Sequence, residues 1–349
     1  MFMENVDATV LVTSLPALAH DLGHDPITLK LAITAYVIGL GVFIPICGWV
    51  ADRFGSRTVF RTAIGIFIVG SLISAASTSL GMFVVARFVQ GIGGAMMVPV
   101  GRIIIFRSVP KSDFIRAVNY LTVPALLGPV VGPPLGGFIT TYLHWRLIFV
   151  INVPIGIFGI WLANRHIANV READPGRLDW AGLVLSAGGA SLFMLGLSLV
   201  GGELVSGTAS TLMCVAGALL LLAYWFYARR VELPVLDLRL LRIPSFHASV
   251  VGGSLFRIGL GAVPFLLPLA LQEGLGMTAF AAGAITCASA FGSIFMKPFA
   301  SGVLARFGFR QVLMINAAIS GLVIAVYGVF VPGTPHWLIW CVVLVGGVF

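Results

Sequence analysis

Three segments of the sequence place charged or amide side chains among apolar residues. Asp7 stands one helical turn after Glu4, Arg87 stands three residues before Gln90, and Arg257 lies in a later apolar run. A charge inside a membrane segment is costly and usually faces a cavity or a charged partner, which makes it a functional candidate. The sequence therefore marks these five side chains as candidates for a functional role within the membrane.

Asp7 is the predicted proton carrier. It lies about 11 residues before the outer end of the apolar run 6–18, which is about 16 Å at the rise of a helix. That depth is near the middle of a bilayer, where transporter sites lie. Burial favours the protonated form of a carboxyl group, and Glu4 on the same helix face adds like-charge repulsion. The alternative for Asp7 and Glu4 is a cap or an interfacial carboxylate.

Arg87, Gln90 and Gly94 are spaced i, i+3 and i+7, so they share one face of a helix. The alternative for Arg87 is a structural arginine bonded to a backbone carbonyl. Arg257 is expected to be the other buried charge, and it could neutralise Asp7 or contact an anionic substrate.

No pattern typical of an enzyme or a metal site accompanies these residues. The cysteines stand singly in apolar runs without a CxxC spacing, which is typical of small buried hydrophobic side chains. A membrane-embedded enzyme would need clustered His, Asp or Glu within spans, and His247 is isolated. We therefore expect no catalytic residue, no metal and no cofactor.

A loop between two apolar runs carries a charged turn. It reads Gly48-Trp-Val-Ala-Asp52-Arg53-Phe-Gly55-Ser56-Arg57. Glycine permits a tight turn, and Asp52 can pair with arginines of the loop or of a neighbouring span. A charged cluster that is made in one conformation and broken in another is what a gate requires. The alternative is an ordinary basic cytoplasmic loop. A weaker copy, with Ala305 at the acidic position, runs from Gly302 to Arg310.

A second glycine pattern lies in the run 117–141. It reads Gly128-Pro129-Val-Val-Gly132-Pro133-Pro134-Leu-Gly136-Gly137. Glycines every four residues let another membrane helix approach closely, and prolines remove backbone donors and bend a helix. The pattern predicts a packed, bendable joint, with a merely structural packing stripe as the alternative.

The elements that must position these residues are membrane helices. Of the 349 residues, 59% are hydrophobic and 10% are charged, whereas soluble domains carry about 25% charged residues. About a dozen apolar runs are long enough to approach or span a bilayer as helices. The formal net charge of +8 could suggest nucleic acid, but the basic residues form no single patch. We expect an all-α polytopic membrane protein that binds no nucleic acid.

The basic residues also orient the helices. Five alternate loops hold 17 of the 21 Lys and Arg residues, and the loops between them hold only Lys30 and Arg146. Because Lys and Arg stay on the cytoplasmic side during insertion, the first run should begin in the cytoplasm. We expect a multi-pass protein of the inner (cytoplasmic) membrane.

The motifs together resemble the major facilitator superfamily, and in particular its fourteen-span drug:proton antiporters of the EmrB/QacA type. The loop at Gly48 is similar to G-x-x-x-D-R-x-G-R-[RK], with Ser56 departing from it. The segment Arg87-Phe-Val-Gln90-Gly91 resembles R-x-x-Q-G, which is implicated in proton coupling, and the glycine-proline stripe resembles the antiporter motif. The first run resembles L-D-x-T-x-x-N-x-A-L-P, which Asp7, Thr9 and Pro16 match while Thr13 and Ser14 depart from it. The segment after Gly91 resembles multidrug exporters of the MdtD type.

This resemblance implies two six-helix bundles with two extra linking helices, here incomplete. Residues 1–164 would form the N-terminal bundle with a shortened first helix, 165–245 the linking helices with cytoplasmic loops, and 246–349 the start of the C-terminal bundle. Both ends of the chain are expected to be truncated. The stripe would then be an antiporter hinge, and the charged loop an inner gate.

The resemblance further implies proton-coupled efflux of small, often amphipathic compounds such as drugs. A small-molecule substrate, protons and the lipid bilayer are the expected partners, and the proton gradient is the energy source. Whether a periplasmic adaptor protein binds to the transporter stays an open question. The alternatives are an exporter or importer of a metabolite or siderophore with the same fold, and an inactive fragment or non-transporting membrane component.

Overall fold

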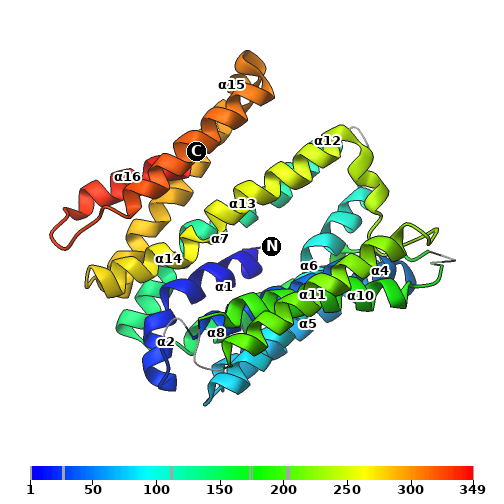
Figure 1. The fold of residues 1–349 in the computed structure, drawn as a ribbon, viewed down its shortest axis with the longest axis horizontal. Coiled ribbons are helices and arrows are strands. Elements are labelled where there is room, and N and C mark those ends of the chain that lie inside the picture. The colour runs from blue at the N-terminus through cyan, green and yellow to red at the C-terminus, as the bar shows by residue number, and fades with distance from the viewer. Residues whose placement is uncertain are drawn as a thin grey trace. The chain divides into compact units, whose positions relative to one another are not determined.

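The computed structural model describes residues 2–25, 28–110, 113–172, 174, 176–201 and 205–348, without the side chains of 114–116, 118–126, 129, 298 and 301. Across these ranges the regular elements are helices, and no strand occurs (Figure 1). Nine of the described helical stretches are long and apolar enough to cross a membrane. The predicted all-α polytopic membrane fold is therefore confirmed.

The described helices form two compact units that interleave along the chain. The first unit contains residues 1–18, 121–148 and 245–349, and the second contains residues 19–120 and 149–244. The predicted domain boundaries after residues 164 and 245 stay a prediction.

The second unit is built from long membrane helices and the short turns between them. Its elements are α3 (Lys30–Phe43), η1 (Ile44–Ile46), α4 (Cys47–Phe54), α5 (Ser56–Ala75), α6 (Leu80–Ser108), α9 (Asn152–His166), α10 (Trp180–Leu199), α11 (Gly207–Ala228) and η3 (Leu238–Arg242). The first residues of α7 (Phe114–Tyr142) also belong to it.

Glycines bring α3 and α5 onto α6 at backbone distance. A Cβ added to Gly39 of α3 would lie 2.8 Å from the Phe88 carbonyl oxygen of α6. A Cβ added to Gly93 of α6 would lie 2.6 Å from the Ala63 carbonyl oxygen of α5. Since helices in lipid associate through van der Waals packing rather than the hydrophobic effect, such small residues set which faces meet.

The two predicted linking helices, α10 and α11, pack against each other and α10 also packs on α3. Leu183 and Ala187 of α10 form a buried cluster with Ile46 of η1. Near the other end of the contact, the hydroxyls of Thr34 and Ser198 are 2.8 Å apart. The linking pair is thus part of the same unit as α3 and α4.

The first unit contains the N-terminal helices, most of α7 and the C-terminal third of the chain. Its elements are α1 (Phe2–Thr13), the start of α2 (Leu15–Leu22), α7, part of α8 (Leu147–Val150), α12 (Pro244–His247), the π-helix η4 (Ala248–Gly252), α13 (Gly253–Gly261), α14 (Val263–Leu269), the π-helix η5 (Ala270–Gly274), α15 (Ala279–Tyr327) and α16 (His336–Val348).

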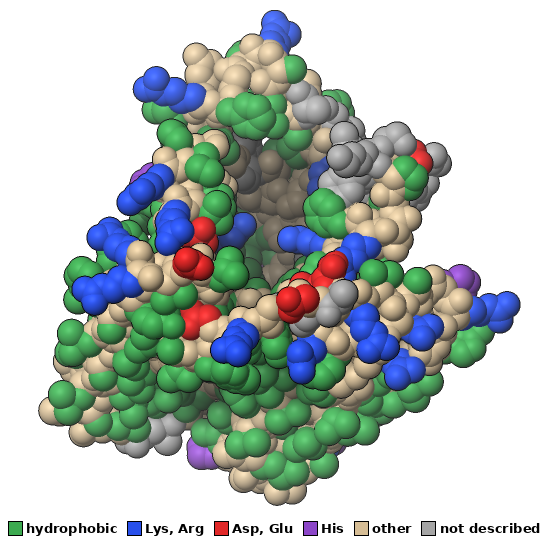
Figure 2. All heavy atoms as spheres, turned by 90° about the vertical axis from the view of Figure 1, so that its right-hand side faces the viewer, with side chains coloured by type: hydrophobic (Ala, Val, Ile, Leu, Met, Phe, Trp, Pro, Cys, Tyr) green, Lys and Arg blue, Asp and Glu red, His purple; other side chains and the backbone are tan. Residues whose placement is uncertain are grey.

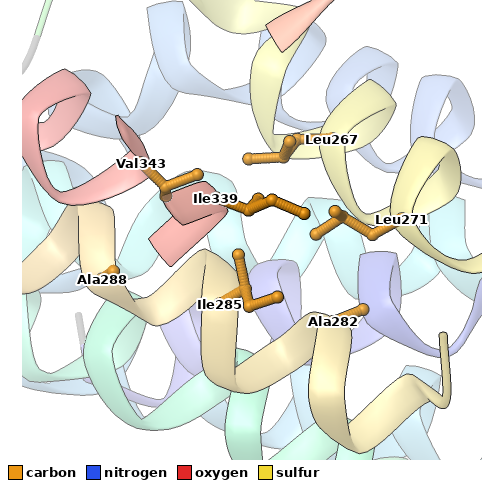
Figure 3. Packing of buried hydrophobic residues seen from close by; sticks show 7 residues of the cluster. All are labelled: Leu267, Leu271, Ala282, Ile285, Ala288, Ile339 and Val343. Carbon is orange, nitrogen blue, oxygen red and sulfur yellow. The ribbon is translucent and has the colours of Figure 1, made fainter. Parts of the chain in front are cut away.

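A buried apolar cluster joins α14, η5, α15 and α16 in this unit. Figure 3 shows Leu267 and Leu271 facing Ile339 and Val343, with Ile285 pointing into the same space from α15. Ile339 and Val343 are fully buried, so α16 is fixed against the two preceding helices.

Two predicted boundaries differ from the structure. The apolar run 6–18 is two helices, α1 and α2, which meet at Ser14. Pro16 has no N–H to donate to the carbonyl of Val12, and its ring crowds that carbonyl, which explains a break at this place. The predicted loop 302–310 is helical except at Gly308, whose φ is 75°.

We expect Gly93→Ala to lower the free energy of unfolding by about 1 to 3 kcal/mol, because the new Cβ would overlap the backbone of Ala63 and Phe67. Gly101→Ala, in the same helix, is the matched control. Its Cβ would meet only Phe60 at 3.7 Å, so it should be neutral or stabilising by up to about 1 kcal/mol. Thermal unfolding in detergent distinguishes them, and equal stability of the two variants would contradict the packing described.

Candidate functional site

A buried polar network centres on Arg87 in the second unit. The guanidinium Nη1 donates to Gln90 Oε1 at 2.6 Å, and the Gln90 amide nitrogen donates to the Ser71 hydroxyl at 2.8 Å. The Asn152 amide nitrogen donates to the same hydroxyl at 3.2 Å. Arg87 is 1% exposed, and Gln90, Ser71 and Asn152 are 0% exposed. The network therefore joins α5, α6 and α9 inside the helix bundle.

Aromatic rings cover the charge of Arg87. Its Cζ lies 4.6 Å from the ring centroid of Tyr36 and 5.9 Å from that of Phe149. A desolvated arginine over an aromatic face gains a cation–π attraction of about 2 kcal/mol. The sequence places Arg87 and Gln90 on one helix face, as the structure has them, but it misses Tyr36, Ser71 and Asn152. Ser71 and Asn152 are polar residues in apolar runs, which is the signal that could have revealed them.

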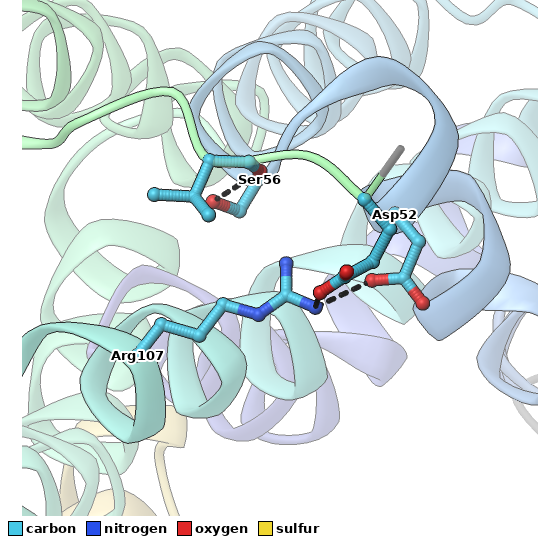
Figure 4. Close-up of polar contacts among 5 residues, drawn as sticks. Asp52, Ser56 and Arg107 are labelled. Carbon is cyan, nitrogen blue, oxygen red and sulfur yellow. Dashed lines mark hydrogen bonds and ion pairs between the residues drawn. The ribbon is translucent and has the colours of Figure 1, made fainter. Parts of the chain in front are cut away.

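The predicted charged loop 48–57 is helical except at Gly55, where α4 ends and α5 begins, and this segment, which we still call the charged loop, contains an ion-paired cluster. Arg107, at the end of α6, places Nη2 2.7 Å from Asp52 Oδ1 and 3.0 Å from Glu172 Oε1 (Figure 4). The predicted partner of Asp52 among the neighbouring spans is thus Arg107. In the part of the chain that the structure describes, Asp52 makes no ion pair with Arg53 or Arg57.

The other members of this loop have different roles. The Arg53 guanidinium lies over Trp49, 5.8 Å from the ring centroid, and Arg57 Nη1 donates to the Ile167 carbonyl oxygen at 3.5 Å. Gly55 has φ 90°, which L side chains rarely adopt, so the turn requires glycine. Gly48 lies in α4, and an added Cβ there would meet open space. Figure 2 shows Lys and Arg side chains, with a few carboxylates among them, crowding the face turned to the viewer.

The glycine stripe of α7 is a contact surface for α1 in the first unit. Added Cβ atoms at Gly128, Gly132 and Gly136 would overlap, respectively, Asn5, Thr9 and Thr13 of α1. The spacing of four residues is therefore the same on both helices. The Thr9 hydroxyl also lies 3.4 Å from the Gly128 carbonyl oxygen.

The stripe meets α15 on its other side. A Cβ at Gly137 would overlap the backbone of Ala279 and Phe280, and one at Gly283 would overlap Pro133. The α7 helix is continuous through these residues. The side chain of Pro129 lies outside the described part of the structure. The close packing that the glycines predict is present, and their role as a hinge stays a prediction.

The three remaining candidate charges lie on α1 and α13 and differ in burial. Asp7 is buried in α1, 1% exposed, and Glu4 is half-buried with an Oε2 atom that has no hydrogen-bond partner among the described residues. Arg257 is exposed on α13, so the prediction that it is buried is wrong. Its helix packs on η4, α14 and α15, and these neighbours leave the Arg257 face uncovered.

A cavity of about 330 Å³ lies beside α1 in the first unit. Ala8, Thr9 and Val12 form its α1 wall. The remaining lining residues come from α7, α14 and α15 and are Pro133, Val263, Pro264, Leu267, Pro268, Thr286, Ser289 and Tyr327. Of the α1 lining, Thr9 belongs to the motif found in the first apolar run, whereas the lining from α14 and α15 carries no signal that apolar spans elsewhere lack.

Comparisons with known proteins agree on one family. The family model described as Major Facilitator Superfamily matches residues 1–349. A protein of Pectobacterium atrosepticum named as the multidrug resistance protein MdtD is 37% identical over 338 residues, which are 97% of this chain and 72% of that protein. A protein of Haemophilus influenzae named as the transport protein HsrA is 37% identical over 340 residues, covering 97% of this chain and 73% of that protein.

Two solved structures share the fold. The peptide transporter POT in complex with sulfate has a TM-score of 0.68 at 16% identity, over 99% of this chain and 78% of that chain. The D-xylose-proton symporter has a TM-score of 0.66 at 16% identity, over 99% of this chain and 76% of that chain. At this identity the likeness shows the fold alone.

We expect Arg87→Met to lower the free energy of unfolding by about 2 kcal/mol or more, because it removes the charged donor to Gln90 inside the bundle. Arg257→Met is the matched control, since Arg257 is exposed and a surface substitution changes stability by about 0.5 kcal/mol or less. Melting temperatures in detergent measure both. Equal losses in the two variants would contradict the different burial of the two arginines.

Proposed function

The chain belongs to the major facilitator superfamily, and from this premise we propose that it exports small amphipathic compounds, such as drugs, in exchange for protons. It is a multi-pass membrane transporter with multidrug resistance proteins of the MdtD name among its relatives. The family identified from its sequence motifs is confirmed. We place the transporter in the inner membrane, with the proton gradient as its energy source and no cofactor.

The cavity beside α1 is the observation that carries this proposal. Eight of its eleven lining residues are Ala, Val, Leu, Pro or Tyr. Ligand sites are mostly apolar with a few placed polar groups, and about 330 Å³ is the lower end of their usual volume. Such a lining favours compounds with a substantial apolar body.

The three Thr and Ser hydroxyl groups of the lining are already engaged as donors. Thr9 donates to the Asn5 carbonyl oxygen at 2.7 Å, Thr286 to that of Ala282 at 3.0 Å, and Ser289 to that of Thr286 at 2.9 Å. A hydroxyl that donates its single hydrogen can still accept. The three hydroxyls thus offer acceptors to a ligand, which suits a compound that carries a few N–H or O–H donors on an apolar body.

The proton would be carried by Asp7 on the same helix as the α1 wall of the cavity. Asp7 is buried and stands one residue before Ala8 in the lining. Protonation of a buried carboxylate removes its charge, and a compound that binds beside α1 would be affected by that change. Competition between proton and compound is how inward proton flow would drive outward export.

The remaining candidates would act on the conformational change. The buried Arg87–Gln90 network would couple the protonation to helix movement, and the Asp52–Arg107–Glu172 cluster would form the inner gate. An ion pair with side chains 24% and 30% exposed is weak enough to break in a transport cycle. The α7 stripe would keep α1 and α15 closely packed and so limit leakage of protons.

We expect Asp7→Asn to abolish ethidium efflux driven by a pH gradient, because an amide cannot carry the proton. The measurement is the ethidium fluorescence of vesicles that contain the full-length protein, with the gradient imposed by dilution. Asp21→Asn in α2 is the matched control, since Asp21 is exposed, and it should keep efflux within about twofold of the original rate.

Undiminished efflux by Asp7→Asn would remove Asp7 as the proton carrier. If the unmodified protein exported ethidium at the same rate with and without the pH gradient, proton coupling itself would be refuted. Gradient-driven movement of ethidium toward the cytoplasmic side of the protein would refute export.

A further inference from the structure

The segment 167–172 between α9 and α10, which we call the connector, lies across the α4–α5 loop. Two backbone hydrogen bonds fasten it there. Ser56 N donates to the Val170 carbonyl oxygen at 3.0 Å, and Glu172 N donates to the Asp52 carbonyl oxygen at 3.0 Å. The two bonds lie on either side of the Gly55 turn. Figure 4 shows the bond of the Ser56 side chain and the carboxylate of Asp52 facing Arg107.

The connector supplies a cap that the loop cannot supply itself. The first backbone N–H groups of a helix need partners from outside the helix, and the residue at the N-cap usually provides one with its side chain. At α5 the N-cap is Gly55, which has no side chain. Asn169 of the connector provides the cap instead, since its Oδ1 accepts a hydrogen bond from Thr58 N at 3.2 Å.

Asn169 also occupies the space beside Gly55. A Cβ on Gly55 would lie 2.6 Å from the Asn169 side-chain carbon Cγ. The glycine therefore does two things at once. It permits the positive φ of the turn, and it leaves room for the capping amide of the connector.

Glu172 adds a second carboxylate to the inner cluster. Arg107 Nη2 contacts Asp52 of the loop and Glu172 of the connector, so one guanidinium joins the loop, the connector and the end of α6. Glu172 is the more exposed partner, at 55% against 30% for Asp52. Its contribution is expected to be the smaller one, because exposed ion pairs are weak.

The chain beyond the connector is anchored to the same helices. Trp49 of α4 donates its Nε1–H to the Gly176 carbonyl oxygen at 3.1 Å. Asp179 caps α10, accepting from Gly182 N at 2.8 Å, and also accepts from the Tyr227 hydroxyl at 2.6 Å. The segment that carries the connector is therefore held at α9, at α4 and at the start of the linking helices.

We propose that the connector is a working part of the gate loop and that Asn169 and Glu172 are positioning residues for it. Asn169 holds the start of α5, and Glu172 holds the Arg107 side chain beside Asp52. The proposal rests on the proposed function only in taking the loop as a gate. The contacts that hold the loop thus come from a segment that lies more than 100 residues later in the sequence.

The weaker copy of the loop has the same turn, without such a contact among the described residues. Gly308 has φ 75° and ψ 156°, close to the 90° and 135° of Gly55. An added Cβ at Gly308 would meet nothing within 4 Å. Within the described residues, the capping contact is therefore seen at Gly55 and not at Gly308.

Cysteine labelling tests the role of Asn169. Ser56 is 1% exposed beneath the connector, whereas Phe54 on the same loop is 53% exposed. Single cysteines Ser56→Cys and Phe54→Cys are made in the full-length protein after the native cysteines are replaced by serine. We expect a maleimide to label position 56 slowly and position 54 rapidly. Asn169→Ala should then speed labelling at position 56 about fivefold, which corresponds to the loss of one cap.

Asn169→Asp should restore slow labelling, because a carboxylate oxygen accepts the same bond and suits a helix N-terminus. Val170→Ala is the matched control, since the connector uses only the Val170 backbone, and it should leave labelling unchanged. Glu172→Gln should speed labelling less than Asn169→Ala does. The melting temperature should be alike in all four variants, which separates local opening from general unfolding.

Equal labelling of positions 56 and 54 would overturn the proposal, and so would an Asn169→Ala variant that labels like the original or an Asn169→Asp variant that does not recover. In vesicles, Asn169→Ala should lower the maximal rate of ethidium efflux and leave its KM unchanged, because the connector touches the gate and not the cavity. Failure of the unmodified protein to export ethidium would count against the proposed function alone, since the labelling result does not depend on export.

Discussion

Hydrocarbon offers no hydrogen-bond partner to a backbone amide or carbonyl, so each apolar segment of this chain must satisfy its backbone within a helix. That requirement leaves the ends of the helices as the places where backbone groups still need partners. The α4–α5 junction illustrates the consequence. There a glycine turn leaves N–H groups of α5 without a cap, and Asn169 and Val170 of a distant segment provide the acceptors. The geometry of the charged loop follows from this need as much as from its charges.

Inside the bundles the same solvent removes the usual reason for helices to associate, because lipid is as apolar as leucine. Glycines decide which faces meet instead. Gly39 and Gly93 bring α3 and α5 onto α6, and this close contact encloses Arg87 between Tyr36 and Gln90. Gly91, the glycine of the R-x-x-Q-G pattern, lies against the Tyr36 backbone in the same contact, so the pattern combines a charge with a glycine that lets α3 approach it. On α7, the stripe from Gly128 to Gly136 repeats at the spacing of Asn5, Thr9 and Thr13 on α1.

Much of this architecture could be predicted from the sequence, because apolar runs and basic loops report the membrane directly. The pairs that lie within one helix were also predictable, as Arg87 and Gln90 show. Partners from other helices were not, since Asn152 and Glu172 stand in segments whose position depends on the packing of several spans. The prediction that Arg257 is buried failed for a related reason. Its apolar neighbours in sequence predict burial, but burial depends on which helices cover that face of α13, and the described ones leave it exposed.

The two copies of the glycine turn show how far a local motif determines function. Gly55 and Gly308 adopt nearly the same backbone conformation, so the glycine that the two copies share is associated with the same turn. The acidic residue of the first copy is Ala305 in the second, and the capping amide that crowds Gly55 has no counterpart within 4 Å of Gly308. A turn with an ion pair and a cap can be held closed, whereas a turn with neither can only redirect the chain. Among the described residues, the two copies therefore differ in what packs on the glycine, and the gating role that we propose belongs to the loop that Arg107 and Asn169 hold.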